Sequence, residues 1–488
     1  MKKTIILALI LTGFSTIAQV TVNWANYPGG VSVAADASDN VYTVNWDYNP
    51  GGDITLSKRD DAGNIIWEVP YNNTNPTRHE VATWVATDSQ GNIIVSGTIR
   101  SGYSNPVNAN SLLMKYDPSG NLLWRVVYET DFDGSSTKKC LIDASDNIYV
   151  LGLGNSGTGM VTKIKKFSSN GTTLWSYFDN AGIGAPVNFK FTADNCIIIA
   201  SRSIYGSING YAKIDSEGNV VWSLAGVYSL TAGDAAGDND GNSYLIHEAY
   251  NATPPGSILK KISPSGSVIW EKKNTMAGFR VEVGSDNNPV ISGFPNSGTV
   301  GAAFMKYDDN GSVLWQNLDA DGPGFALLAH AQMRLDASNA AYLAAGTMFE
   351  MAVCKVNGDG SSAWTATAPG SYAYSIDFGT ENRIFITGGA TAKLTQSGTF
   401  TGIEAGEKEN VKIFPNPAVN GIISLELPRQ THFPVSAELW SLSGKLYLSR
   451  DLHKSKATIN TDGIGNGAYL LVLRDSEHIQ SSRMLIIN

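Results

Sequence analysis

A unit of about fifty residues recurs along most of the chain, and this repeat limits the possible folds more than any other sequence feature. Each copy carries a lysine, then a short side chain that can accept hydrogen bonds, then a glycine and, in most copies, a tryptophan, as in Lys115–Trp124 and Lys306–Trp315. Repeats of this length are typical of propellers and solenoids. The lysine occurs eight times, at Lys58, Lys115, Lys166, Lys213, Lys261, Lys306, Lys355 and Lys393.

The residues after each lysine predict a tight turn. In the copy that begins at Lys115, the Asp117 side chain can accept hydrogen bonds from backbone N–H groups just ahead of it. Gly120 stands where the turn needs a positive φ, which glycine adopts without strain. A second turn signal, with Gly-Asn, Asp-Asn or Asn-Asn at its corner, precedes each lysine and predicts a hairpin. These hairpin segments begin at Asp36, Asp88, Asp143, Phe191, Asp238, Gly284, Asp336 and Gly379.

Each unit therefore predicts four antiparallel strands, which is the blade of a β-propeller. Seven units carry a tryptophan in the fourth strand, but the last has Gly402 at that place. The segment Val20–Tyr27 contains Trp24 and has the pattern of a fourth strand with no unit before it. Placed beside Lys393, it would complete the last sheet and remove two exposed edges. We predict an all-β, eight-bladed β-propeller closed by the N-terminal strand, with seven blades as the alternative.

The Lys-x-Asp-x-x-Gly-x-x-x-Trp pattern resembles the tryptophan-docking repeats of quinoprotein-like propellers, and Asp-x-x-Gly-Asn-x-Tyr-Val-x-Gly is similar to bacterial β-propeller repeats of the SBBP type. The resemblance covers about residues 20–403 and implies the fold, but both groups include enzymes, scaffolds and proteins of unknown role. Quinoprotein dehydrogenases carry adjacent cysteines beside their cofactor, whereas Cys140, Cys196 and Cys354 lie far apart. We therefore predict no cofactor and three buried free thiols.

The N-terminus predicts export. Two lysines precede an apolar run, and Thr16-Ile17-Ala18 has small residues at the positions that a signal peptidase reads, so residues 1–18 are predicted to be a signal peptide. No later apolar stretch reaches the roughly 18 residues of a membrane span, so we expect no transmembrane segment in the mature chain. The formal net charge of −9 argues against nucleic acid as a partner.

The repeat pattern predicts a propeller domain at 19–403, and the charged segment 404–410 is predicted to be a linker. Four landmarks follow, which are Pro415-Asn416-Pro417, Gly444-Lys445, Gly467-Ala-Tyr469 and the final Arg483–Asn488. In order and spacing they resemble the C-terminal sorting domain of type IX secretion, over about residues 411–488. The resemblance implies export across the outer membrane, the secretion machinery as a partner, and a secreted or cell-surface protein. Without it, the segment predicts a small β-sandwich, such as an adhesive terminal domain.

Candidate functional residues are those that break the repeat, because a packing device is needed in every blade but a binding or catalytic group only once. We expect them at loop ends and on the first strand of each blade, which lines the central channel. Polar candidates there are His79, Glu80, Lys138, Lys139, Arg280, Glu282, His330, Arg334 and Tyr372. Loops with Tyr71 and Tyr103 are rich in tyrosine and asparagine, which suit sugar or peptide recognition. The alternative for each residue is a solvated or internally paired position.

One hairpin corner, Asp238-Asn-Asp240-Gly-Asn242, also has the closely spaced oxygens of a calcium loop. Every other unit has similar turn residues at the same place, so we interpret these oxygens as turn caps and predict no metal site, with calcium as the alternative.

Two classes of function are consistent with these features. We favour a non-catalytic propeller, secreted or on the cell surface, that binds a glycan or a protein. The alternative is an extracellular polysaccharide hydrolase or lyase, with a histidine, arginine or tyrosine at the channel mouth as acid or base. A passive scaffold without a small ligand is a third interpretation.

Overall fold

A computed structural model of the chain describes residues 20–46, 53–72, 78–100, 109–128, 136–155, 160–179, 182–202, 208–229, 233–249, 256–295, 301–320, 332–380, 383–396, 412–419, 422–427, 434–441, 446–461, 464, 467–474 and 479–487. These residues form strands and turns, with no helix among them. The strands divide into two compact units, one from Val20 to Gln396 and one that holds the C-terminal strands.

The first unit contains eight antiparallel sheets of four strands, numbered here as blades 1 to 8. Blade 1 contains β2 Ser32–Ala35, β3 Val41–Trp46, β4 Ile54–Arg59 and β5 Ile65–Tyr71, and blade 2 contains β6 His79–Thr87, β7 Ile93–Arg100, β8 Asn110–Tyr116 and β9 Leu122–Tyr128. Blade 3 contains β10 Ser136–Ile142, β11 Ile148–Asn155, β12 Met160–Phe167 and β13 Thr173–Phe178, and blade 4 contains β14 Ala185–Phe191, β15 Ile197–Arg202, β16 Ile208–Ile214 and β17 Val220–Tyr228.

The second half of the ring repeats this arrangement. Blade 5 contains β18 Asp234–Gly237, β19 Ser243–Glu248, β20 Ser257–Ile262 and β21 Val268–Asn274, and blade 6 contains β22 Met276–Val283, β23 Pro289–Pro295, β24 Ala302–Tyr307 and β25 Val313–Ala320. Blade 7 contains β26 Gln332–Leu335, β27 Ala341–Gly346, β28 Glu350–Val356 and β29 Ser362–Pro369, and blade 8 contains β30 Ala373–Phe378, β31 Arg383–Gly388, β32 Thr391–Gln396 and β1 Val20–Asn26.

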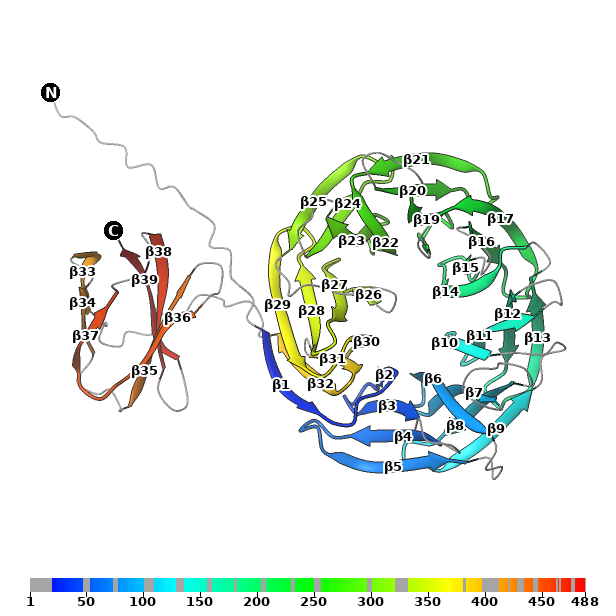
Figure 1. Cartoon of the computed structure of the whole chain (residues 1–488), viewed down its shortest axis with the longest axis horizontal. Coiled ribbons are helices and arrows are strands. Elements are labelled where there is room, and N and C mark those ends of the chain that lie inside the picture. The colour runs from blue at the N-terminus through cyan, green and yellow to red at the C-terminus, as the bar shows by residue number, and fades with distance from the viewer. Residues whose placement is uncertain are drawn as a thin grey trace. The chain divides into compact units, whose positions relative to one another are not determined.

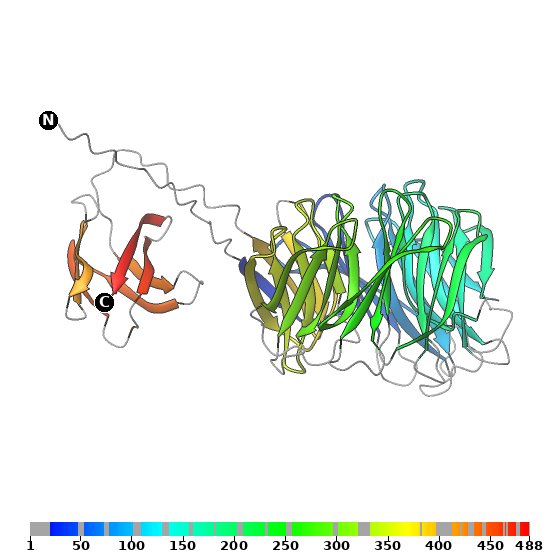
Figure 2. The ribbon, with the colours of Figure 1, turned by 90° about the horizontal axis from the view of Figure 1, so that it is seen from above.

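The N-terminal strand closes the ring, as the sequence predicted. Strand β1 pairs antiparallel with β32, and Trp24 lies opposite Lys393 in that pairing. The blades follow one another around the ring in Figure 1, and Figure 2 shows the same ring from its edge. The prediction of eight blades is confirmed, and the seven-bladed alternative is wrong. The corner of blade 4 begins at Thr192, one residue later than predicted, because the Thr192 N–H donates to the Cys196 carbonyl.

The predicted turn chemistry recurs in the structure. Asp117 Oδ1 accepts hydrogen bonds from the N–H groups of Ser119 and Asn121, each at 2.9 Å. Gly120 has a φ of +88° and donates its N–H to the Asp117 carbonyl. The three cysteines are buried free thiols, as predicted.

Five of the eight tryptophans of the repeat donate a hydrogen bond to the following blade. In these five, the indole Nε1 donates to a backbone carbonyl in the turn between the third and fourth strands of that blade. The pairs are Trp24 with Asp61, Trp124 with Ser169, Trp175 with Ser216, Trp270 with Asp309, and Trp315 with Gly358, at 2.8 to 3.2 Å. The first of these pairs ties the N-terminal strand to blade 1. The tryptophan thus connects adjacent blades, which explains its recurrence.

The lysine of the repeat holds two turns together. Lys115 Nζ lies 2.8 Å from Asp88 Oδ2, at the hairpin corner of its own blade, and donates to the Ser169 carbonyl of the next blade at 3.2 Å. Burial alone would raise the pKa of Asp88, but hydrogen bonds from Lys115 and Asn92 hold that pKa below its usual value. Lys213 with Asp194 and Lys306 with Asp286 repeat the ion pair at 2.6 Å.

A substitution at Gly120 tests whether the Trp67 ring packs against the turn that contains Gly120. We expect Gly120→Ala to lower the free energy of unfolding by about 2 kcal/mol, because alanine is strained at positive φ and its Cβ would lie 3.2 Å from Trp67 Cδ2. The control is Gly91→Ala, which has a φ of +76° but only a 3.9 Å contact with Pro118, so we expect about 1 kcal/mol there. Urea unfolding measures both, and equal losses would contradict a docking role for Gly120.

The C-terminal unit contains two small groups of strands. They are β33 Lys412–Val419, β34 Ile422–Glu426 and β37 Lys456–Asn460 in one group, and β36 Leu446–Leu452, β35 Val435–Ser441, β38 Gly467–Arg474 and β39 Ile479–Ile487 in the other. A parallel pairing of Ala418 with Ile487 joins them. Both groups supply one buried core, which includes Leu425, Ile459 and Leu471. This agrees with the predicted small β-sandwich.

Candidate functional site

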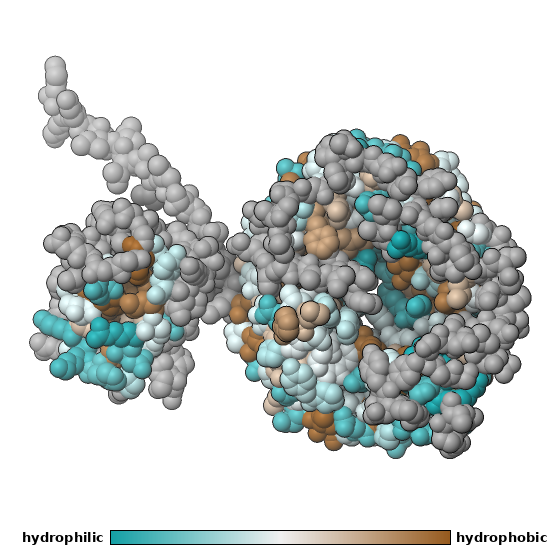
Figure 3. All heavy atoms as spheres, viewed as in Figure 1, coloured by the Kyte–Doolittle hydropathy of each residue, from teal (hydrophilic) through white to brown (hydrophobic). Residues whose placement is uncertain are grey.

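The innermost strands β2, β6, β10, β14, β18, β22, β26 and β30 line the central channel, which Figure 3 shows as a hollow with hydrophilic side chains. Each strand leads into a hairpin corner, so equivalent positions can be counted back from the first residue of the corner. The residues four positions before the corner, one from each blade, are called ring A. They are Ser32, Trp84, Lys139, Asn188, Asp234, Arg280, Gln332 and Ser375. Two residues before it is ring B, which consists of Ala34, Ala86, Leu141, Lys190, Ala236, Glu282, Arg334 and Asp377.

Ring A joins each blade to the next. An innermost strand has one edge without a neighbouring strand, and its N–H groups there need acceptors. Several ring A side chains of the preceding blade provide them, at 3.2 to 3.3 Å. The pairs are Ser32 with the Val85 N–H, Asp234 with Val281, Gln332 with Ile376, and Ser375 with Val33. The polarity of ring A is therefore in part structural, which is the alternative that the sequence left open.

Ring B differs from blade to blade, because it is charged in blades 4, 6, 7 and 8 and apolar in the others. Lys190 Nζ lies 2.8 Å from Asp234 Oδ2 and 2.9 Å from Glu282 Oε1, so it links blade 4 to blades 5 and 6. Arg334 Nη2 lies 3.4 Å from Asp377 Oδ1, which links blade 7 to blade 8. The Asp234 side chain is only 1% exposed, whereas that of Arg334 is 45% exposed.

The pKa values of this cluster follow from its ion pairs. Burial would raise the pKa of Asp234, but the charges of Lys190 and Arg280 and the hydrogen bond from Lys190 hold that pKa below its usual value. Burial would lower the pKa of Lys190, but Asp234 and Glu282 raise it above its usual value. Both partners are therefore ionised at neutral pH.

Two lysines of blade 3 lie in a different environment. Lys139 Nζ donates to the Asn188 Oδ1 at 3.0 Å and lies 5.1 Å from the ring centroid of Trp84. Burial, and the nearby positive charges of Lys190 and Arg334, lower the pKa of Lys139 to about 7. Lys138 sits at a β-bulge and is exposed, yet surrounding protein lowers its pKa. Lys139 is therefore largely enclosed by protein, whereas the Lys138 side chain reaches solvent.

The structure brings together three of the residues that the sequence singled out. Glu282 pairs with Lys190, Arg280 lies near the charges of Asp234 and Glu282, and Arg334 pairs with Asp377; these ring A and ring B residues are called the channel cluster below. Arg280 Nη1 also donates to the Phe279 carbonyl at 2.9 Å. Sequence reasoning missed Lys190, Asp234 and Asp377 in the same cluster. Aligning the eight copies on their hairpin corners would have found them, because they occupy the same two positions as the residues that were predicted.

Tyr71, His79 and Glu80 form a separate group at the junction of blades 1 and 2. Arg125 Nη1 donates to the Tyr71 hydroxyl at 3.3 Å, and burial raises the pKa of Tyr71. His79 and Glu80 are buried at the start of β6, at the end of the strand opposite to the hairpin corner. Their burial makes them less accessible to a ligand than the channel cluster.

Tyr372 lies just before β30 and has a φ of +37°. Its ring stacks on that of Tyr374, with centroids 6.3 Å apart. This pair presents aromatic groups at the end of β30 away from its corner. Two other predicted candidates, Tyr103 and His330, lie outside the described residues.

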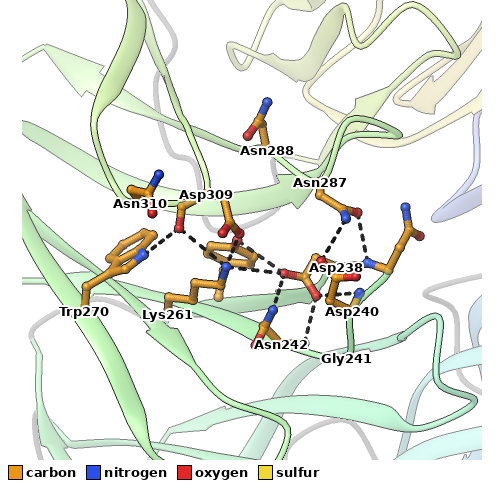
Figure 4. Close-up of polar contacts among 12 residues, drawn as sticks. Asp238, Asp240, Gly241, Asn242, Lys261, Trp270, Asn287, Asn288, Asp309 and Asn310 are labelled. Atoms are coloured by element: carbon orange, nitrogen blue, oxygen red, sulfur yellow. Dashed lines mark hydrogen bonds and ion pairs between the residues drawn. The ribbon is translucent and has the colours of Figure 1, made fainter.

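The predicted turn at Asp238 is a hydrogen-bonded corner (Figure 4). Asp238 Oδ1 accepts from the N–H groups of Asp240 and Asn242, and its Oδ2 accepts from Asn242 Nδ2 at 2.8 Å. Lys261 lies 3.8 Å from the same Oδ2 and pairs with Asp309 of the next blade. In the described part of the chain, no group of three or more His, Cys, Asp or Glu side chains is arranged to hold a metal ion. Calcium binding at Asp238, Asp240 and Asn242 stays an untested alternative.

The motif residues of the C-terminal unit lie on two strands. Pro415, Asn416 and Pro417 interrupt the pairing of β33 with β34, since the register shifts between Phe414 and Val419. Gly467 begins β38, and the Tyr469 side chain is buried in the core. Gly444 and Lys445 lie outside the described residues.

The chain thus combines an eight-bladed β-propeller with a separate small β domain. Residues 412–488 match the family described as the secretion system C-terminal sorting domain. The C-terminal unit is therefore a type IX secretion sorting domain, which directs export to the cell surface or beyond and implies contact with the secretion machinery. The described residues contain no helix, and therefore none that is long and apolar enough to cross a membrane.

Solved structures align with this chain at low sequence identity. Sqt1 from Chaetomium thermophilum has a TM-score of 0.54 at 10% identity, over 78% of this chain and 100% of that one. PorZ, a surface component of the type IX secretion system of Porphyromonas gingivalis, has a TM-score of 0.37 at 11% identity, over 93% of this chain and 73% of that one. A funoran endo-beta-hydrolase of Wenyingzhuangia aestuarii is 29% identical over 85 residues. That match spans 17% of this chain and 11% of the hydrolase.

Proposed function

We propose that the propeller is the binding module of an exported protein, that its site is the central channel and the channel mouth, and that it binds a glycan or a protein outside the cell. The observation that carries this proposal is ring B. A scaffold needs the same device in each blade, whereas Lys190, Glu282, Arg334 and Asp377 place charge in four blades only. A channel that differs from blade to blade offers a unique surface to a ligand.

The ionisation of the cluster favours binding over hydrolysis. A general acid for glycoside cleavage needs a raised pKa, whereas the pKa of Asp234 is lowered. Asp234 also accepts hydrogen bonds from Asn188 and from the Val281 N–H, so its oxygens serve the contacts between blades. The stacked pair Tyr372 and Tyr374 adds an aromatic surface of the kind that sugars and peptides use.

A glycan array and a reducing-end assay test this proposal together. The chain from Gln19 onward is applied to neutral and acidic polysaccharides, and bound protein and new reducing ends are measured in the same samples. We expect binding without release of new ends. New reducing ends would favour the hydrolase alternative, and a lyase would reveal itself by new absorbance from unsaturated sugar. A result with no binding and no cleavage would overturn a glycan ligand. A protein ligand would then be sought with variants of the channel residues.

A further inference from the structure

The channel strands are more positive than the chain that contains them. The eight innermost strands hold five cationic side chains, which are Lys138, Lys139, Lys190, Arg280 and Arg334. They hold four carboxylates, of which Glu80 is buried at the start of β6. The chain as a whole carries a net charge of −9. Positive charge is therefore gathered in the channel of an acidic protein, where the walls concentrate its field.

The carboxylates of the channel are matched to particular cations. Asp234 and Glu282 pair with Lys190, and Asp377 pairs with Arg334. No carboxylate of the described residues lies within 4 Å of the ammonium groups of Lys138 and Lys139, and the contacts of Lys139 are a neutral amide and a carbonyl. These two lysines carry the excess positive charge, Lys139 fully only below its pKa of about 7.

Lys139 and Arg334 place positive charge on opposite sides of the channel. They belong to blades 3 and 7, which lie across the ring from each other in Figure 1, and the charge of Arg334 lowers the pKa of Lys139. Arg334 is 45% exposed despite its contact with Asp377. An anionic group that enters the channel would meet cations on both sides.

We propose that the channel binds an anionic glycan, one whose sugars carry carboxylate or sulfate groups, and that Lys138, Lys139 and Arg334 contact those groups. This inference rests on the binding function proposed above and specifies the ligand of the same site. Charge-assisted hydrogen bonds from Lys and Arg to such oxygens are stronger than neutral ones.

Aromatic side chains favour a glycan over an acidic peptide as the ligand. Trp84 is part of ring A and is only partly buried, beside Lys139. Tyr372 and Tyr374 stack on each other at the end of β30. Flat rings beside cationic groups match sugar rings that carry acidic substituents.

The proposal predicts tighter binding at lower pH. The groups around Lys139 are Lys138 on its own strand, Lys190 on β14, Asp234 on β18, Glu282 on β22 and Arg334 on β26. With a pKa of about 7, Lys139 is mostly charged at pH 6 and mostly neutral at pH 8. A bound anion stabilises the charged form, so linkage limits the loss of affinity from pH 6 to pH 8 to about tenfold.

Isothermal titration with four probes tests the proposal, namely polygalacturonate oligosaccharides, sulfated galactan oligosaccharides, a neutral β-glucan and poly-glutamate. We expect one or both anionic glycans to bind more tightly than the neutral one, and Lys138→Met and Lys139→Met each to weaken that binding about tenfold or more. The control, Lys273→Met, removes the same charge from the exposed outer strand β21 and should change affinity less than twofold. Lys139→Arg keeps the charge, so it should retain binding and lose the decline between pH 6 and pH 8.

The outcomes separate this inference from the proposed function. Binding of the neutral glucan alone, or anionic binding unchanged in Lys138→Met and Lys139→Met, would overturn the anionic ligand while leaving a binding module. Equal binding of poly-glutamate would overturn the assignment to a glycan. Binding of no polymer would overturn this inference and the glycan ligand of the proposed function, and would leave only its protein ligand. Thermal unfolding of each variant shows whether a loss of affinity reflects a loss of folding, and Lys138→Met, at an exposed site, is the variant expected to fold best.

Discussion

Replacing Asp234 with alanine is expected to lower the free energy of unfolding of the propeller by about 3–5 kcal/mol. The Asp234 side chain is 1% exposed and accepts hydrogen bonds from Lys190 at 2.8 Å, Asn188 at 3.0 Å and the Val281 N–H at 3.2 Å. Alanine would leave a lysine that is 14% exposed with one carboxylate in place of two, and would remove the acceptor of a buried N–H. Urea unfolding followed by tryptophan fluorescence measures the loss.

The pH dependence of that loss identifies the charge as its cause. The pKa of Asp234 is lowered in the folded protein, so its contribution is present above the unfolded pKa of about 4 and disappears as pH falls through the lower folded value. The pKa of Lys190 is raised, so its contribution is complete below about 10.4 and disappears as pH rises through the folded value.

Asp234→Asn is the matched control, because it keeps the shape and an acceptor but not the charge. We expect the difference between Asp234→Asn and the unmodified chain to be largest near neutral pH and to shrink below about pH 4. A constant difference from pH 3 to pH 8 would contradict the ion pair and attribute the effect to packing.

The sequence predicted the ring more completely than the channel, for a physical reason. Strand pairing and turns depend on local residues that recur in every copy, such as Asp117 and Gly120, so eight copies confirm one another. The docking of Trp124 on the Ser169 carbonyl joins residues of different blades. It also recurs, so it produces a periodic pattern in the sequence.

The channel cluster leaves no such pattern. Lys190 of blade 4 contacts Asp234 of blade 5 and Glu282 of blade 6, and at both ring positions the presence and the sign of the charge change from copy to copy. Its partners are fixed by the closed ring and not by any local pattern. Arg280, Glu282 and Arg334 could be predicted as exceptions to the repeat, whereas their pairing needed three dimensions. His79 and Glu80 were also exceptions, but they are buried at a strand end, so an exception alone does not distinguish a site from a structural adaptation.

Removing the N-terminal strand should have the other large effect. A chain that lacks residues 20–26 loses the pairing of β1 with β32, the packing of Val20 and Val22 on the core of blade 8, and the docking of Trp24 on blade 1. Trp24 is only partly buried, so its loss alone costs less than the roughly 3–5 kcal/mol of a core tryptophan, but the packing of Val20 and Val22 and several hydrogen bonds are lost with it. The total is comparable to the 5–15 kcal/mol that typically stabilises a folded domain.

The exposed edge of β32 gives this truncation a second, distinct consequence. An edge strand with unpaired N–H and C=O groups recruits other chains, so the truncated protein should form oligomers that light scattering detects, besides melting at a lower temperature. A synthetic peptide of residues 20–27, added in excess, should restore the monomer and raise the melting temperature by mass action. A comparison of Trp24→Ala with Trp67→Ala then separates the effect of ring closure from the effect of tryptophan docking. Trp67 lies within a blade whose four strands are continuous in sequence, so Trp67→Ala affects docking without affecting closure. A truncated chain that stays monomeric with an unchanged melting temperature would show that the ring is held by its other seven blades alone.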